Sequence, residues 1–203
     1  MGSPCRDTPG LDGPEADPWP DPVRTAAVAA VAALRAVGRT VASAESLTGG
    51  LVGAALTSVS GSSKVYRGGV VAYATDLKHQ LLGVDAGLLD RVGAVHPDVA
   101  RGMAEGVRDL LGADYGVATT GVAGPEPQDG RPPGTVWLGL AGPDGSWAVD
   151  VSSDGTRSDI RLATTARALA RLRTAVAGVP DAERPTPVAG LEPPLEESGP
   201  SGR

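Results

Sequence analysis

The chemistry that this sequence could perform centres on one lysine and one group of small hydroxyl residues. Only two lysines, Lys64 and Lys78, occur in the chain, against sixteen arginines. A lysine can give up its proton in a protein whereas an arginine cannot, so a desolvated lysine can serve as a general base. Lys78 lies one turn into a predicted helix that follows a predicted strand. From there its amine could reach a pocket at the strand end, or it could simply be solvated.

The small hydroxyl residues lie in a turn that follows an earlier predicted strand. This turn contains Glu45, Ser46, Thr48, Gly49 and Gly50. Such a strand-to-helix turn directs backbone N–H groups outward, where the helix dipole favours an anion. Ser46 and Thr48 could instead be ordinary helix caps. A neutral lysine beside a serine hydroxyl activates that hydroxyl as a nucleophile without histidine. Ser46 and Lys78 would together suit acyl transfer.

Two further segments also follow predicted strands. Tyr73 precedes the helix that carries Lys78, and its hydroxyl could orient the lysine or a substrate, or could be the wet tip of a packed ring. The segment from Thr120 through Gly121 to Gly124 could supply backbone N–H donors to an oxyanion. Glycines in a loop are, however, also what a tight turn requires.

Composition excludes several other classes of function. The net charge of -6 argues against a nucleic-acid-binding face. Cys5 is the single cysteine, so we expect no disulfide and no thiolate metal site. His79 and His96 are too few and poorly placed for a zinc site or a histidine base. No apolar run resembles a signal peptide or a bilayer span, so we expect a cytoplasmic protein that does not associate with membranes. We also expect that the protein needs no metal and no cofactor.

The elements that must position these residues alternate between helix and strand. We predict strands over 40–44, 69–74 and 115–119, a hairpin over 135–141 and 147–151, and helices over 21–37, 48–59, 76–82, 86–92, 97–111 and 158–177. The run 69–74 is continuously apolar, as expected of a strand buried on both faces. The pattern indicates an α/β fold, a three-layer-like sandwich with a mixed β-sheet flanked by helices. Ligands in such folds bind at the carboxyl ends of parallel strands, so the three candidate segments should share one pocket.

The two ends of the chain differ from this middle part. Residues 1–21 and 179–203 are rich in proline, glycine and acidic residues and show no apolar periodicity. Such composition is typical of disordered tails. The predicted folded domain therefore covers residues 22–178.

Four segments of the chain resemble one known family, the CinA C-terminal domain, which includes the nicotinamide-nucleotide amidases called PncC. They read AESLTGGLVGAALTSVSGSS, GGVVAYATDLKHQLLGV, GAVHPDVARGMAEGVRDLLGADYGVATTGVAGP and PPGTVWLGL. They cover most of residues 40–141 in the family's order. The resemblance implies an amidohydrolase that converts nicotinamide mononucleotide, a pyridine nucleotide, to nicotinate mononucleotide and ammonia through a Ser/Lys dyad. It also suggests a homodimer.

The same resemblance assigns roles to individual residues. Lys78 and Tyr73 match the lysine and tyrosine of a family Y-S-N-x-x-K motif, and Thr120 matches the hydroxyl residue before G-[IV]-A-G-P. Arg157 looks like the arginine of a family G-D-R motif. Ser46 and Ser63 both match family serines. Topology favours Ser46 as the nucleophile, because Ser63 precedes strand 69–74 and should lie near the opposite edge of the sheet.

The chain also departs from the family pattern at several positions. Leu47 replaces a cysteine, Thr75 an asparagine and Thr156 an aspartate, and the loop after Gly124 is richer in proline. These changes leave two alternatives open. One is a nucleotide-binding or regulatory module of the same fold without turnover, and the other is an amidase that acts on a different small amide.

Overall fold

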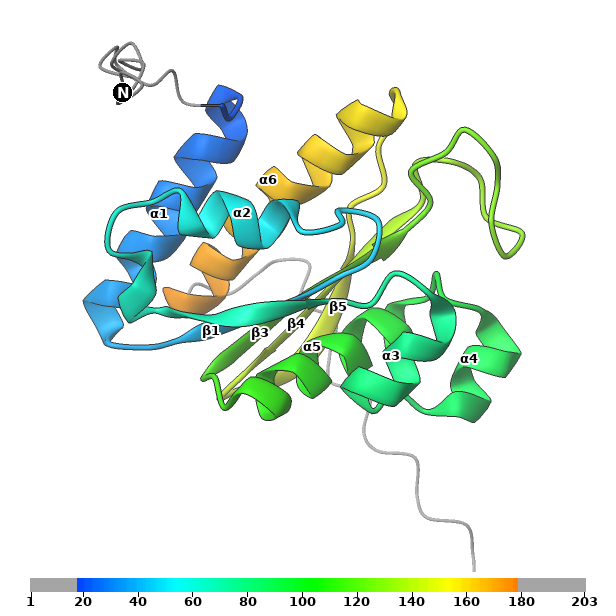
Figure 1. The fold of residues 1–203 in the computed structure, drawn as a ribbon, viewed down its shortest axis with the longest axis horizontal. Coiled ribbons are helices and arrows are strands. Elements are labelled where there is room, and N and C mark those ends of the chain that lie inside the picture. The colour runs from blue at the N-terminus through cyan, green and yellow to red at the C-terminus, as the bar shows by residue number, and fades with distance from the viewer. Residues whose placement is uncertain (1–17, 179–203) are drawn as a thin grey trace, which may run out of the picture.

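The computed structural model describes residues 18–178, and within them five strands form one sheet in the order β2-β1-β3-β4-β5 (Figure 1). The strands are β1 (Val41–Glu45), β2 (Tyr66–Val71), β3 (Tyr115–Gly121), β4 (Val136–Gly142) and β5 (Gly145–Asp150). Most of the first predicted tail, all of the second, and Cys5 lie outside the described residues. No helix within the described part of the chain has the length and apolarity needed to cross a membrane.

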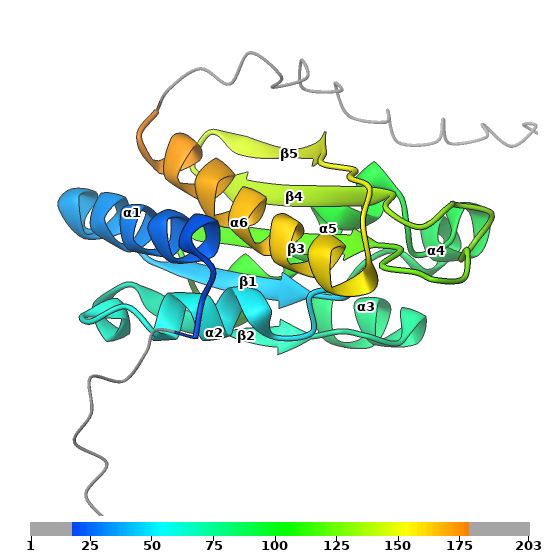
Figure 2. The same ribbon diagram turned by 90° about the horizontal axis from the view of Figure 1, so that it is seen from above.

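Helices cover both faces of this sheet. One face carries α1 (Asp21–Val37), α2 (Leu51–Thr57) and α6 (Arg157–Val176). The opposite side carries α3 (Thr75–Leu82), α4 (Ala86–Val92) and α5 (Pro97–Leu111), as Figures 1 and 2 show. Each face has its own buried hydrophobic cluster. The predicted three-layer α/β sandwich with a mixed sheet is confirmed.

Because three strands run in the same direction, the candidate segments lie at the same end of the sheet, where these strands end. β1 lies in the middle of a parallel trio, paired with β2 on one side and β3 on the other. The carboxyl ends of the three strands therefore lie together, and the turns that follow them are neighbours. β4 and β5 complete the sheet as the predicted antiparallel hairpin.

The helix α5 shows how local sequence signals fix an element. His96 caps its start by accepting from the Asp98 N–H, Pro97 occupies its first turn, and Gly112 ends it in a left-handed conformation. The helix packs very close to the sheet. A Cβ added at Gly139 of β4 would lie 1.9 Å from the Ala100 carbonyl oxygen, so only glycine allows this approach.

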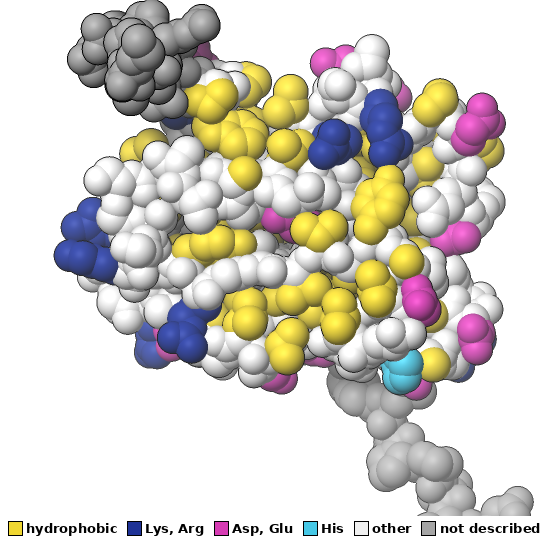
Figure 3. Space-filling view, viewed as in Figure 1, with side chains coloured by type: hydrophobic (Ala, Val, Ile, Leu, Met, Phe, Trp, Pro, Cys, Tyr) yellow, Lys and Arg dark blue, Asp and Glu magenta, His cyan; other side chains and the backbone are white. Residues whose placement is uncertain are grey.

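The prediction that residues 69–74 form a strand buried on both faces is wrong. β2 ends at Val71 and is an edge strand, in which half-buried residues alternate with exposed ones. The apolar run predicts a central strand, but it begins with Gly69, which adds no apolar side chain, and it continues past β2 into the loop that leads to α3. Val71 is 47% exposed, and hydrophobic side chains gather on this side of the molecule (Figure 3).

Candidate active site

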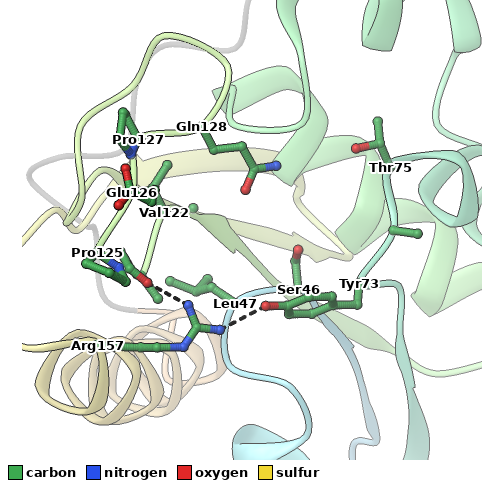
Figure 4. Close-up of a pocket in the computed structure, with 14 residues that line it drawn as sticks. Ser46, Leu47, Tyr73, Thr75, Val122, Pro125, Glu126, Pro127, Gln128 and Arg157 are labelled. Carbon is green, nitrogen blue, oxygen red and sulfur yellow. Dashed lines mark hydrogen bonds between the residues drawn. The ribbon is translucent and has the colours of Figure 1, made fainter.

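A pocket of about 550 Å³ opens where the three parallel strands end. The segments that follow β1, β2 and β3 contribute to it, together with the start of α6 (Figure 4). The residues that line it are Ser46, Leu47, Tyr73, Ala74, Thr75, Gly121, Val122, Ala123, Gly124, Pro125, Glu126, Pro127, Gln128 and Arg157. The expectation that the three segments share a pocket is therefore confirmed.

Lys78 is buried beneath this pocket. Its side chain is among the largest fully buried ones in the described part of the chain, with 1% exposure. Its Nζ donates to the Ala72 carbonyl oxygen at 2.9 Å and to the Tyr73 carbonyl oxygen at 3.4 Å. The loop between β2 and α3 thus holds the amine in place, and the alternative of a solvated lysine is excluded.

The amine of Lys78 lies beside the hydroxyl of Ser46. The distance from Nζ to Oγ is 3.2 Å, and the Ser46 backbone N–H donates to the Thr119 carbonyl at 3.0 Å, which ties its turn to β3. Ser46 is mostly buried but lines the pocket wall. The predicted meeting of these two side chains is confirmed in geometry.

Ser63 lies elsewhere, as topology predicts. It belongs to the short 3-10 helix Ser62–Lys64, which precedes β2, and the Val65 carbonyl after it accepts from the N–H of Val41 at the start of β1. Ser46 follows the other end of β1. At about 3.3 Å per residue, the length of β1 separates the two serines by roughly 15 Å. Ser63 therefore does not reach Lys78.

The environment of Lys78 favours its neutral form. Burial lowers the pKa of the Lys78 amine to about 8, while the negative charges of Asp129 and Asp76 act in the opposite direction. An amine with a pKa near 8 is partly neutral at physiological pH. It can therefore accept the proton of a neighbouring hydroxyl.

Glu45, predicted to bind substrate, instead holds the turn from inside the fold. Its carboxylate is 2% exposed and accepts from the N–H groups of Gly50 at 2.9 Å, Val52 at 3.0 Å and Gly53 at 2.8 Å. It also accepts from the Thr48 hydroxyl at 2.8 Å. A carboxylate at the start of α2 satisfies the free N–H groups of that helix and complements its dipole. The prediction is corrected because these contacts leave the carboxylate buried, away from the pocket.

The anion site predicted at Thr48, Gly49 and Gly50 is corrected for the same reason. The Gly50 N–H is bound to Glu45, and the Gly49 N–H donates to the Ser46 carbonyl at 3.0 Å. Thr48 is fully buried, and its hydroxyl also lies 2.8 Å from that of Thr119. None of the three lines the pocket. The helix start that the sequence suggested for a phosphate is occupied by the chain's own carboxylate.

Thr120 and Gly121 have different roles although they are adjacent. The Thr120 hydroxyl donates to the Ala94 carbonyl at 2.7 Å on the buried side of β3, so its predicted place in the site is wrong. Gly121 lines the pocket. Opposite it in β4, the Val136 N–H donates to the Ser152 hydroxyl and the Val136 carbonyl accepts from the Val151 N–H. The Gly121–Val136 pair is therefore not hydrogen-bonded. The Gly121 N–H therefore points toward β1 and the end that carries Ser46.

Tyr73 and Arg157 form one side of the pocket. Arg157 Nη2 donates to the Tyr73 hydroxyl at 2.9 Å, and its Nη1 donates to the Gly124 carbonyl at 2.8 Å (Figure 4). These bonds connect the start of α6 with the loops after β2 and β3. Arg157 is exposed and retains N–H donors for a ligand. The two residues and Gly124 lie where the sequence expects a binding site.

Some residues of the pocket and its surroundings are not predicted from the sequence. Gln128 and Glu126 lie in the proline-rich loop after Gly124, and the side chains of Gln128, Thr75 and Ser46 face a common space (Figure 4). Arg161 was also missed, although it lies four residues after Arg157 and so on the same side of α6. Its guanidinium binds the turn that carries Ser46.

Neither metal binding nor histidine chemistry has support among the described residues. Residues 18–178 contain no group of three His, Cys, Asp or Glu side chains arranged to hold a metal ion. His79 contacts the Val84 carbonyl at 2.8 Å and His96 caps α5. The arrangement in the pocket, a buried amine on a serine hydroxyl with a backbone N–H nearby, suits nucleophilic attack on a carbonyl.

Comparisons with known proteins show what this chain is similar to in sequence. The chain is 52% identical to a CinA-like protein from Frankia casuarinae over 147 residues, and 49% identical to one from Anaeromyxobacter dehalogenans over 149 residues. Each match covers 72% of this chain but only 34% and 36% of the relative, so the chain spans about a third of their length.

Solved structures extend the likeness to three dimensions. A competence/damage inducible protein from Agrobacterium tumefaciens is 35% identical with a TM-score of 0.75, covering 79% of this chain and 99% of that one. A CinA superfamily protein from Klebsiella pneumoniae is 30% identical with a TM-score of 0.74, covering 77% and 98%. The CinA C-terminal domain family matches residues 23–176. The chain therefore belongs to the CinA C-terminal domain family.

Proposed function

We propose that this protein is an amidohydrolase that converts nicotinamide mononucleotide to nicotinate mononucleotide and ammonia. The observation that carries the proposal is the buried amine of Lys78 placed 3.2 Å from the Ser46 hydroxyl at the wall of the pocket. The choice of substrate is supported by the motifs that resemble those of nicotinamide-nucleotide amidases, together with membership of the CinA C-terminal domain family. The reaction itself requires no metal and no redox cofactor.

The proposed reaction proceeds in two halves through an ester on Ser46. In the first half, neutral Lys78 accepts the hydroxyl proton while the Ser46 oxygen attacks the carboxamide carbon. The N–H of Gly121 stabilises the oxyanion that develops. The protonated amine of Lys78 then returns its proton to the leaving nitrogen, so that the C–N bond breaks and ammonia departs. In the second half, Lys78 takes a proton from water while the water oxygen attacks the ester carbon. The C–O bond to Ser46 then breaks, nicotinate mononucleotide leaves, and the Lys78 amine returns the proton to the Ser46 oxygen.

The pocket offers a distinct place for each part of such a substrate. Arg157, with its free N–H donors at the outer side, is the proposed partner of the phosphate group. The carboxamide would lie at the inner end, against Ser46 and near the polar side chains of Thr75 and Gln128 (Figure 4). A cavity of about 550 Å³ is within the range of small-molecule sites.

The direct test is an ammonia-release assay across a panel of pyridine nucleotides and simple amides. The proposal expects release from nicotinamide mononucleotide above all other members of the panel. Release from another amide alone would replace the substrate. Binding of nicotinamide mononucleotide in a thermal-shift assay, with no ammonia from any compound, would favour the non-catalytic module instead.

The dependence of the rate on pH should report the neutral form of Lys78. Because burial lowers the pKa of this amine to about 8, its reactive fraction falls tenfold for each pH unit below that value. We expect kcat/KM to rise between pH 6.5 and 8 and to level off above it. A profile that is flat over this interval would show that no such base controls the rate.

A further inference from the structure

The turn that carries Ser46 is held from outside by a side chain of α6. Arg161 Nε donates to the Leu47 carbonyl at 3.0 Å, and its Nη2 donates to the Thr48 carbonyl at 2.8 Å. These are the two carbonyls that follow Ser46 in the chain. The guanidinium also packs on the turn, since a Cβ added at Gly49 would lie 3.4 Å from Nη2. The fork of one arginine thus fixes two successive peptide groups.

The two sides of the turn are held by complementary groups. Inside the fold, the Glu45 carboxylate accepts from N–H groups at Gly50, Val52 and Gly53. Outside, Arg161 donates to carbonyl oxygens. The turn needs this support because Gly49 and Gly50 both have positive φ, at 59° and 101°, a conformation that glycine adopts without strain but does not enforce.

The same end of α6 also contacts the segment that precedes Lys78. One helical turn before Arg161, Arg157 binds the Tyr73 hydroxyl, and the Tyr73 carbonyl accepts from the Lys78 amine. The first two turns of α6 therefore connect the segment of the base with the turn of the hydroxyl. In Figure 3, basic side chains gather over this end of the helix.

We propose that Arg161 is a positioning residue that places the Ser46 hydroxyl on the Lys78 amine by fixing the carbonyls of Leu47 and Thr48. The inference rests on the proposed role of Ser46 as the nucleophile. It assigns to Arg161 no contact with the substrate, because Arg161 does not line the pocket. Its loss should lower kcat and leave KM almost unchanged.

The chain supplies a matched control on the same helix. Arg167 Nη1 also donates to two backbone carbonyls, those of Val151 and Ser152, at 2.6 and 3.1 Å. These carbonyls follow β5 and lie outside the pocket lining. Arg161→Met and Arg167→Met each remove an arginine from two carbonyls, but only the first frees the Ser46 turn.

The first measurement is the steady-state release of ammonia from nicotinamide mononucleotide. We expect Arg161→Met to lower kcat about 100-fold, the effect of misplacing a reacting group by about 1 Å, with KM within about twofold of wild type. Arg161→Lys, which can bind one carbonyl, should give an intermediate kcat. Arg167→Met should retain wild-type kcat. Equal kcat in the two methionine variants would overturn the proposal.

The second measurement does not depend on the identity of the substrate. Lysine labelled with ¹³C at Cε gives signals from only two residues, and Lys64→Met identifies that of Lys78. At pH 7 the Lys78 signal should move in Arg161→Met and stay in place in Arg167→Met, because only the first shifts the neighbouring Ser46 hydroxyl. An unmoved signal in Arg161→Met would refute positioning by Arg161. If the wild-type protein released no ammonia, the proposed function would fail, and the signal would still decide the role of Arg161.

Discussion

Lys78→Met is expected to lower ammonia release from nicotinamide mononucleotide by about 10⁴-fold, the upper end of what a positioned base contributes. Methionine has a similar length and is apolar, so it fills the same buried space without accepting a proton. The serine hydroxyl would then have no base, since no other amine or imidazole contacts Ser46 in the described part of the chain. Initial rates with purified variants give the comparison.

Stability should not explain that loss. In the folded state the pKa of Lys78 is about 8, against 10.5 for an ordinary lysine. The unfolded chain therefore binds more protons between these values, and stability rises with pH through that window. Below pH 8 the buried charge costs about 3 kcal/mol, so methionine should not lower the melting temperature at pH 7. Lys64→Met, at an exposed position, is the control, and wild-type-like turnover by Lys78→Met would end the proposed mechanism.

Ser46→Ala is expected to lower kcat for ammonia release about as much as Lys78→Met does, whereas Ser63→Ala should retain wild-type kcat. Of these two serines only Ser46 contacts Lys78, at 3.2 Å from Oγ to Nζ. Ser63 lies before β2, at the opposite end of the parallel strands. Both substitutions remove one hydroxyl from serines that resemble family serines. The pair of variants therefore separates the nucleophile from a serine of the scaffold.

Binding makes this second test more specific. Ser46→Ala should still bind nicotinamide mononucleotide in a thermal-shift assay, because the proposed phosphate partner, Arg157, is unchanged. The serine test would go against Ser46 if Ser63→Ala were the inactive variant, or if Ser46→Ala turned over at the wild-type rate.

The fold followed from sequence wherever strong local signals agreed. The helix α5 has a capping histidine, a proline in its first turn and a glycine after its end, and the structure places it at Pro97–Leu111. The β4–β5 hairpin and α4 were also located correctly. The position of β2 was predicted wrongly because the apolarity of a run does not determine how many neighbouring strands it pairs with. The pairing that makes β2 an edge strand depends on residues far away in the chain.

The candidate site was predictable in its central pair and less so in its surroundings. The scarcity of lysine pointed to Lys78, and the order of the strands pointed to Ser46. Glu45 and Thr48 were misplaced because a polar residue beside a turn can face either the pocket or the turn's own backbone, and only the packing of α2 decides between them. Arg161 was missed because its partners are carbonyl oxygens more than a hundred residues earlier, which leave no side-chain pattern.

The most direct test of the central claim is the titration of Lys78 in the resting protein by the ¹³C signal of its Cε. We expect one of the two lysines to titrate near pH 8, and we expect its signal to shift in Ser46→Ala while the other lysine does not respond. If both lysines titrate above pH 10 and neither responds to the loss of Ser46, then the buried amine beside the serine hydroxyl does not exist in solution. That result would contradict the mechanism built on it.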